Sequence, residues 1–258
     1  MPCSELRLME VCGTHTMAIA RAGLKSLLPE GVELVSGPGC PVCVTPPEVI
    51  DAALDLAMRP GVVIATYGDM VRVPGSRRGD SLARRRAMGA RVMVVYSPMD
   101  AVDWAESHPG SEVVFLGVGF ETTAPGTAAS LLEAAGRGVR NFSVFSMLKR
   151  VEPALRALTA LEGFNIQGFL CPGHVATIIG AEGFRFLPEE YGLPAVVAGF
   201  EPEDILLAVS RLISLVRAGR AELENLYGRA VKAEGNPPAL EEMRRVFVPA
   251  GDSWRGLG

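Results

Sequence analysis

The stretch VVIAT at residues 62–66 decides the fold class, because it is an unbroken run of apolar and β-branched side chains. Such a run is typical of a strand that is buried on both faces of a parallel sheet. Segment 48–58 before it has the apolar spacing of a helix, and segment 91–96 after it is the next apolar strand. Because strands and helices continue to alternate in this way, the sequence predicts an α/β fold.

We expect two lobes, each a mostly parallel β-sheet flanked by helices, followed by a helical C-terminal segment. The turn-rich stretch around His108 predicts the first boundary. The expected divisions are 1–108, which carries the Cys/His motifs, 109–200 as the second lobe, and 201–258 as helices that pack back on the lobes. Within the last segment, helices are expected at 203–218, 220–232 and 238–246, with a short strand at 246–248.

Composition limits the classes of function. The 258 residues include 25 Lys+Arg and 29 Asp+Glu, so the net charge of −4 argues against a protein that binds nucleic-acid backbones. Hydrophobic residues make up 48% of the chain, which excludes disorder over its bulk. No apolar run approaches the roughly 18 residues that span a bilayer. The N-terminus lacks a signal peptide, so we expect a cytoplasmic protein that binds neither nucleic acid nor membrane.

A cysteine and a histidine lie where a predicted strand gives way to a helix. The sequence there is CGTHT at residues 12–16. A thiol at a helix N-terminus gains thiolate character from the helix dipole, which predicts a reactive or metal-binding Cys12. His15, one turn away, can join it as a metal ligand or act as an acid or base. The alternative is a small buried cysteine beside a helix cap.

The next strand-to-helix connection carries the pair Cys40-x-x-Cys43. This spacing is typical of a metal half-site or of a redox dithiol. With Cys12 and His15 it gives four candidate ligands at one sheet edge. A closed zinc site and an iron site are both compatible with that set, and spacing does not choose between them.

Two further connections between a strand and a helix carry candidate site residues. GFETTAP at 119–125 places Glu121 at a helix entrance, and CPGHV at 171–175 places His174 in the same position. Either side chain can line a cleft or be a satisfied core residue. The glycines before Glu121 lack the remainder of a nucleotide-binding fingerprint. The arginines around 77–86 are typical of a solvated face, or of a surface that binds an acidic partner.

Taken together, CGTHT at 12–16, GPGCPVCVTP at 37–46, GFETTAP and CPGHV resemble the HypD family of hydrogenase maturation factors. The resemblance implies a scaffold for the Fe(CN)₂CO group of [NiFe]-hydrogenases. Iron is then held with a HypC-type small chaperone, and a HypE-type partner donates cyanide. Cys12 corresponds to the iron ligand with His15 beside it, and Cys40 and Cys43 to a redox-active pair. Glu121 and His174 fall in motifs that line the family's cleft.

The resemblance also implies a [4Fe–4S] cluster held by four further cysteines, and this sequence has no cysteine after Cys171. We expect a maturation scaffold with a redox or ligand-transfer role rather than a high-turnover enzyme. Two alternatives remain open at this level. One is an α/β binding protein stabilised by zinc at Cys12, His15, Cys40 and Cys43. The other is a metal-free thiol oxidoreductase that uses Cys40 and Cys43 alone.

Overall fold

The computed structural model describes residues 6–257, and these divide into two compact units. Unit 1 contains the residues up to Cys40 together with Arg150–Pro238. Unit 2 contains Pro41–Lys149 and the residues from Ala239 onward. Each unit is built around a parallel sheet with helices, so the predicted α/β fold of two lobes is confirmed. The division differs from the predicted consecutive boundaries, because each unit takes residues from two separate stretches of the chain.

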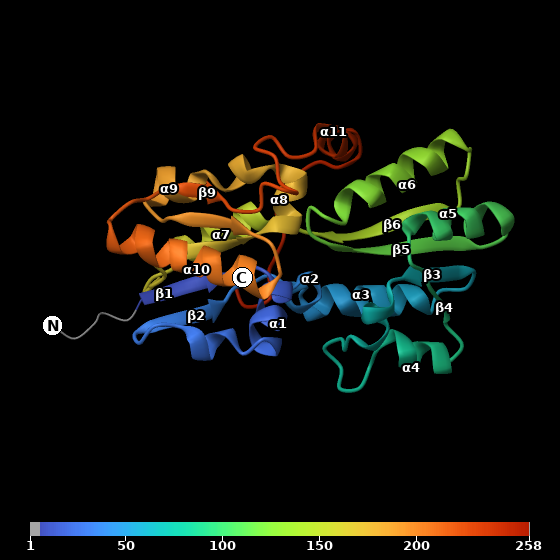
Figure 1. The fold of residues 1–258 in the computed structure, drawn as a ribbon. Coiled ribbons are helices and arrows are strands. Elements are labelled where there is room, and N and C mark those ends of the chain that lie inside the picture. The colour runs from blue at the N-terminus through green and yellow to red at the C-terminus, as the bar shows by residue number, and fades with distance from the viewer. Residues whose placement is uncertain (1–5, 258) are drawn as a thin grey trace. The chain divides into compact units, whose positions relative to one another are not determined.

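Unit 1 has a five-stranded parallel sheet with the order β2-β1-β7-β8-β9. The strands are β1 (Leu6–Glu10), β2 (Val32–Ser36), β7 (Gly168–Pro172), β8 (Ala195–Ala198) and β9 (Leu223–Asn225). In Figure 1 the blue N-terminal strands therefore share a unit with the orange elements of the last third of the chain. After β2 the chain returns to the opposite side of β1, so the strand order reverses between β1 and β7. In doubly wound sheets, ligands bind at the carboxyl ends of the strands at such a reversal.

Helices cover the sheet of unit 1. They are α1 (Gly13–Arg21), α7 (Val151–Thr159), α8 (Gly173–Ile179), α9 (Phe186–Tyr191) and α10 (Pro202–Arg217), with 3₁₀ turns η1 (Leu24–Leu27) and η3 (Ala181–Phe184). On one face, Leu8 and Leu170 of the sheet form a core with Ile19 of α1 and Leu212 of α10. The opposite face is also apolar and buried at Phe169. Burial on both faces explains why these strands are continuous apolar runs.

Unit 2 has a four-stranded parallel sheet with the order β4-β3-β5-β6. The strands are β3 (Val62–Thr66), β4 (Arg91–Val94), β5 (Glu112–Gly119) and β6 (Phe142–Leu148). The strand predicted at 62–66 is confirmed at both ends. Renumbered within its unit, this sheet has the order 2-1-3-4, and its reversal point lies between β3 and β5. Both units therefore have a doubly wound order.

The helices of unit 2 pack on both faces of its sheet. They are α2 (Pro41–Val44), α3 (Pro47–Ala57), α4 (Leu82–Ala87), α5 (Pro98–Ser107) and α6 (Ala124–Gly136), with the 3₁₀ turn η2 (Gly68–Arg72). The last helix, α11 (Pro237–Val246), belongs to this unit from Ala239 onward. Ile64 of β3 faces a core with Leu54 of α3 and Leu82 of α4. The next residue, Ala65, faces the second core with Val102 of α5. This alternation places β3 at the centre of the unit, buried on both faces.

Two predictions for the C-terminal segment are wrong. The helix expected at 220–232 is replaced by β9, which pairs with β8 and extends the sheet of unit 1. The strand expected at 246–248 does not form, because α11 continues to Val246 and irregular backbone follows it. A strand as short as β9 forms by pairing with β8, and the spacing of apolar residues in its own sequence does not reveal that pairing. Among the residues described, no helix is long and apolar enough to span a bilayer.

Candidate functional site

Cys12 lies at the carboxyl end of β1, where the strand order of unit 1 reverses. It is the N-cap residue of α1, and its Sγ accepts a hydrogen bond from the Thr14 N–H at 3.3 Å. The backbone there is extended, with φ −132° and ψ 129°, as an N-cap requires. Strand and helix together therefore fix the position of this sulfur.

His174 is the imidazole that lies against Cys12. It follows β7, the strand on the other side of the reversal point, and is the second residue of α8. The Cys12 Sγ is 3.7 Å from His174 Nε2 and 3.9 Å from Nδ1. Cys12 is buried and His174 is half-buried. A thiol and an imidazole from residues 162 positions apart in the chain thus meet at the edge where the topology predicts a ligand site.

His15 occupies a different environment from His174. It is fully buried, and its Nε2 donates a hydrogen bond to the Gly199 carbonyl at 2.8 Å. That bond leaves Nδ1 as an acceptor, and this atom is buried without a hydrogen-bond partner. The Phe200 ring lies 4.6 Å from the His15 ring and 5.0 Å from the His174 ring. Burial lowers the pKa of His15 to about 4, so the ring is neutral at physiological pH.

Burial keeps Cys12 protonated, contrary to the expected thiolate. The pKa of Cys12 is raised by desolvation, with a smaller contribution from the Glu10 carboxylate, and this outweighs the bonds from the helix N-terminus. Glu10 is itself buried, accepts a bond from the Cys12 N–H at 3.2 Å and is also bonded by the Thr16 hydroxyl at 2.5 Å. A cation beside Cys12 would reverse this balance, because a metal-bound thiol is deprotonated.

Cys40 lies close to the loop that carries Cys12. Gly39 packs so tightly there that a Cβ on it would lie 2.0 Å from the Val11 carbonyl oxygen. Gly13 donates its N–H to the Gly39 carbonyl, and a Cβ on Gly13 would lie 3.9 Å from Cys40 Cβ. Cys40 belongs to unit 1 and Cys43 to α2 of unit 2. Both are disulfide-bonded, whereas Cys12 and Cys171 are free thiols.

The carboxyl edge of the sheet of unit 2 also carries buried polar side chains. Glu121 follows β5 and is 3% exposed. Thr66 ends β3, and its hydroxyl is buried without a hydrogen-bond partner. Lys149, just after β6, pairs with the Asp252 carboxylate, and its ammonium lies 5.5 Å from the Trp254 ring. The predicted cleft residue Glu121 is therefore at a ligand-binding edge by topology, although its own carboxylate is buried.

The structure joins some of the sequence-predicted residues and separates others. Cys12, Cys40 and His174 gather at one edge of unit 1, while His15 turns its Nε2 to the backbone. The four-ligand set of Cys12, His15, Cys40 and Cys43 is not formed, and residues 6–257 contain no group of three or more His, Cys, Asp or Glu side chains placed to hold a metal. Glu10 was not predicted as a site residue, although a carboxylate at the end of an apolar strand is a signal. Phe200 was not predicted either, because no local signal marks it.

Comparison with known proteins identifies the family. A family model described as "HypD: Hydrogenase formation hypA family" matches residues 2–258. The chain belongs to the HypD family. It is 47% identical to the hydrogenase expression/formation protein HupD of Azotobacter chroococcum mcd 1, a match that covers 100% of this chain and 69% of that relative.

Two further HypD relatives carry descriptions of the same kind. The chain is 46% identical to the hydrogenase maturation factor HypD of Rhizobium leguminosarum bv. viciae, over 100% of this chain and 68% of that relative. It is 47% identical to the hydrogenase maturation factor HypD of Escherichia coli (strain K12), over 98% of this chain and 68% of that relative. Membership of the HypD family supports a role in hydrogenase maturation.

Proposed function

We propose that this chain is a scaffold on which the Fe(CN)₂CO group of [NiFe]-hydrogenases is assembled, and that Cys12 and His174 are its iron donors. The observation that supports this most directly is the 3.7 Å separation of Cys12 Sγ and His174 Nε2 at the reversal point of unit 1. Thiolate and imidazole are donors that suit iron. Iron enters this argument as the cargo of the reaction.

Two donors leave most of the iron coordination sphere open, and an assembly scaffold needs that openness. Cyanide and carbonyl ligands must enter, and the finished group must leave. We assign a further donor to a HypC-type small chaperone, which the family resemblance implies, and cyanide delivery to a HypE-type partner. Cys12 and His174 supply two donors, and a donor from the partner would complete the set.

His174 takes the place of His15 in our assignment. His174 touches the sulfur and is half-exposed, whereas His15 is fully buried and hydrogen-bonded to Gly199. His15 instead holds the Phe200 ring that also packs against His174. A metal-bound imidazole needs a fixed orientation, which a hydrogen bond to its second nitrogen often supplies. For His174, packing against the Phe200 ring serves this purpose.

Cys40 and Cys43 form the proposed redox pair. When two thiols close to a disulfide they release two electrons and two protons, so the pair can reduce a ligand or a metal beside it. The tight contact of Gly39 with the Cys12 loop supports delivery at this site, because it places Cys40 next to that loop. We propose Glu121, which follows β5 in unit 2, as a further functional carboxylate of this scaffold.

One rival function has an observation in its favour. Cys40 and Cys43 are disulfide-bonded, which also suits a metal-free thiol oxidoreductase. That function requires neither Cys12 nor His174. The zinc alternative is weaker, because His15 is hydrogen-bonded to the Gly199 carbonyl and Cys40 and Cys43 are disulfide-bonded.

The test is anaerobic purification of the chain together with a HypC-type partner, read by metal analysis and infrared spectroscopy. We expect iron near one per complex, with absorption in the cyanide and carbonyl stretching region. Cys12→Ser and His174→Ala should lose iron. Cys171→Ser is the matched control, because Cys171 is a buried free thiol, and should keep it.

Three outcomes would contradict the proposal. Zinc in place of iron would favour a structural site. Iron retained by Cys12→Ser would mean that other residues hold the metal. Full disulfide-reductase activity in Cys12→Ser, with no iron in the wild-type complex, would favour the oxidoreductase.

A further inference from the structure

The outer edge of β4 is open. In the part of the chain that the structure describes, β4 pairs with β3 only and stands at the end of its sheet. Val95, which follows β4, donates its N–H to the carbonyl of Thr66 in β3, so its backbone points toward β3. Because the backbone groups of a strand alternate in direction, the N–H and C=O groups of Val92 and Val94 point away from β3. These groups can therefore accept another strand.

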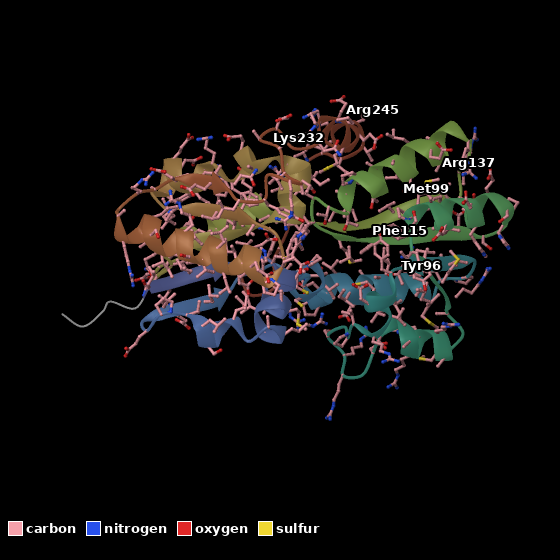
Figure 2. The ribbon with its side chains drawn as sticks, viewed as in Figure 1. Tyr96, Met99, Phe115, Arg137, Lys232 and Arg245 are labelled. Carbon is pink, nitrogen blue, oxygen red and sulfur yellow. The ribbon has the colours of Figure 1, made fainter. Side chains whose placement is uncertain are left out.

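An open groove of about 550 Å³ follows this edge. Val92 and Val94 of β4 form its floor, Arg86 from the end of α4 stands on one side, and Trp104 of α5 on the other. Val94 is 45% exposed, and Tyr96, which follows the strand and is labelled in Figure 2, is 95% exposed. An edge that combines free backbone groups with apolar surface is suited to strand addition.

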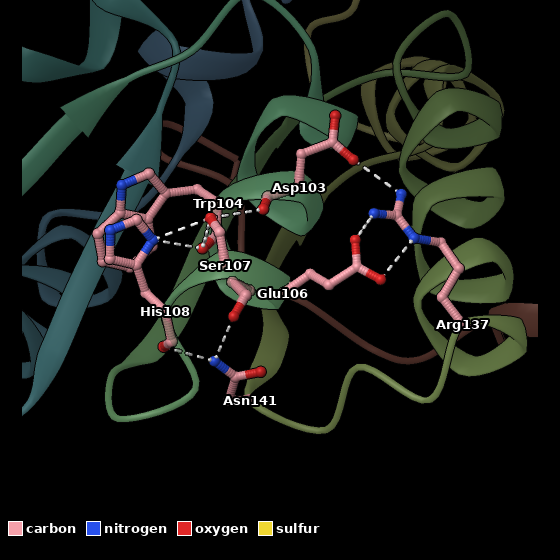
Figure 3. Close-up of polar contacts among 8 residues, drawn as sticks. Asp103, Trp104, Glu106, Ser107, His108, Arg137 and Asn141 are labelled. Atoms are coloured by element: carbon pink, nitrogen blue, oxygen red, sulfur yellow. Dashed lines mark hydrogen bonds and ion pairs between the residues drawn. The ribbon is translucent and has the colours of Figure 1, made fainter.

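The Trp104 wall is held in a fixed position. Its ring stacks on the His108 ring at 3.8 Å with an interplanar angle of 3°, as Figure 3 shows. His108 Nδ1 lies 2.9 Å from the Trp104 carbonyl oxygen, which ties the stacked pair to its own helix. The Arg91 guanidinium lies 5.5 Å from the Trp104 ring and donates to the Ser111 hydroxyl at 3.0 Å. A rigid wall reduces the entropy that a ligand loses on binding.

The charge of this edge selects the ligand. Arg86 and Arg91, which both line the groove, are exposed, and neither takes part in an ion pair within the residues described. Arg85, the neighbour of Arg86 in the chain, differs because it pairs with Asp80 at 2.7 Å. The edge is therefore cationic in a chain whose net charge is −4. A second copy would bring like charges together in an edge-to-edge pair, which opposes dimerisation here.

We propose that the outer edge of β4 binds an extended acidic segment of a partner protein, which adds to the sheet as a fifth strand. Its backbone pairs with Val92 and Val94. Its apolar side chains lie along the groove, and its carboxylates meet Arg86 and Arg91. This surface is separate from the Cys12–His174 site, which belongs to unit 1. The competing explanation is that the arginines only protect a short edge strand from aggregation.

Fluorescence anisotropy of a labelled peptide tests the proposal on the full 258-residue chain. The probe is a short peptide in which valine alternates with glutamate. Two matched peptides carry lysine in place of glutamate, or N-methyl groups on the backbone amides that face the strand. We expect only the first to bind, with an affinity that falls as salt increases, because charged groups on the rim are screened.

Variants separate the charge from the backbone contribution. Arg86→Glu should weaken binding about tenfold. Arg245→Glu, on α11 of the same unit (Figure 2), is the control and should change it less than about twofold. Val94→Pro removes one outward N–H and should abolish binding, while the sheet survives because proline is tolerated on edge strands. Fluorescence of Trp104 and Trp254, both in unit 2, verifies that each variant is folded.

Amide exchange supplies an independent readout. In the free chain, Val92 and Val94 should exchange faster than Val95, and the acidic peptide should slow both. Three results would overturn the proposal. In the first, the lysine peptide binds as tightly as the glutamate peptide. In the second, binding is undiminished when the peptide is N-methylated or when the chain carries Val94→Pro. In the third, the chain forms a dimer that Val94→Pro abolishes.

Discussion

Replacing His15 with glutamine should change how the stability of unit 1 depends on pH. His15 is fully buried, and its pKa is lowered from 6.5 to about 4 by desolvation. Because the folded pKa lies below the unfolded one, the unfolded state binds more protons between these values. Stability therefore falls as the pH falls through this window. At about 1.4 kcal/mol per pH unit, the loss from His15 reaches about 3 kcal/mol at pH 4.

Glutamine keeps an N–H that can reach the Gly199 carbonyl but takes up no proton in this range. At pH 7.5 we expect His15→Gln to be about 1 kcal/mol less stable than the wild type, because it loses packing against Phe200. At pH 4 it should be about 2 kcal/mol more stable, so the two stability curves cross. Glu10, whose raised pKa acts in the opposite direction, is present in both proteins and cancels in the difference.

The assay is amide hydrogen exchange of β1 and β7, corrected for the intrinsic effect of pH, because it reports the free energy of opening of unit 1 itself. Tryptophan fluorescence is unsuitable, since Trp104 and Trp254 both lie in unit 2. Ile19→Ala is the matched control: Ile19 is buried on the same helix and does not titrate, so it should cost about 2–5 kcal/mol at every pH. A difference between His15→Gln and the wild type that stays constant from pH 7.5 to 4 would refute the reasoning.

Two further predictions concern the glycines and the free thiols. Gly39→Ala should destabilise unit 1 by about 2 kcal/mol or more in thermal unfolding, since its Cβ would lie 2.0 Å from the Val11 carbonyl oxygen. The control is Gly126→Ala, at an open helical position, which should be neutral or should stabilise by up to about 1 kcal/mol. Iodoacetamide labelling, read by mass spectrometry, should leave Cys171 unmodified in the native chain at pH 8, because complete burial raises its thiol pKa. Cys12 should react slowly and faster as the pH rises, and rapid labelling of Cys171 would contradict the structure.

Local patterns predicted most of the secondary structure. Buried strands such as 62–66 need side chains that are apolar on both faces, so the sequence records them directly. The strand β9 was not predicted, because its three residues form a strand only through backbone pairing with β8, which lies elsewhere in the chain. The two-lobe architecture was predicted, but not that the first sheet resumes after Lys149. Alternation of strands and helices sets the class of fold, whereas strand order depends on which apolar faces pack together.

The candidate site was likewise predictable in its local features but not in its tertiary contacts. Strand-to-helix connections at Cys12, Cys40 and His174 were visible in the sequence, because small residues and a following helix mark each one. The helix N-terminus was expected to give Cys12 thiolate character, whereas burial raises the pKa of this thiol and outweighs the helix donors. Sequence proximity also favoured His15 as the neighbour of Cys12.

The sequence by itself determined the class of fold and the residue types that carry the chemistry, because burial on both faces and strand–turn–helix connections leave a local signature. Only the tertiary structure decided which of them meet. His15 is three residues from Cys12, yet the helix turns it towards Gly199. His174 is 162 residues away, yet it contacts the sulfur, because β1 and β7 are neighbours in the sheet. Parallel strands align their carboxyl ends at one edge whatever the length of chain between them.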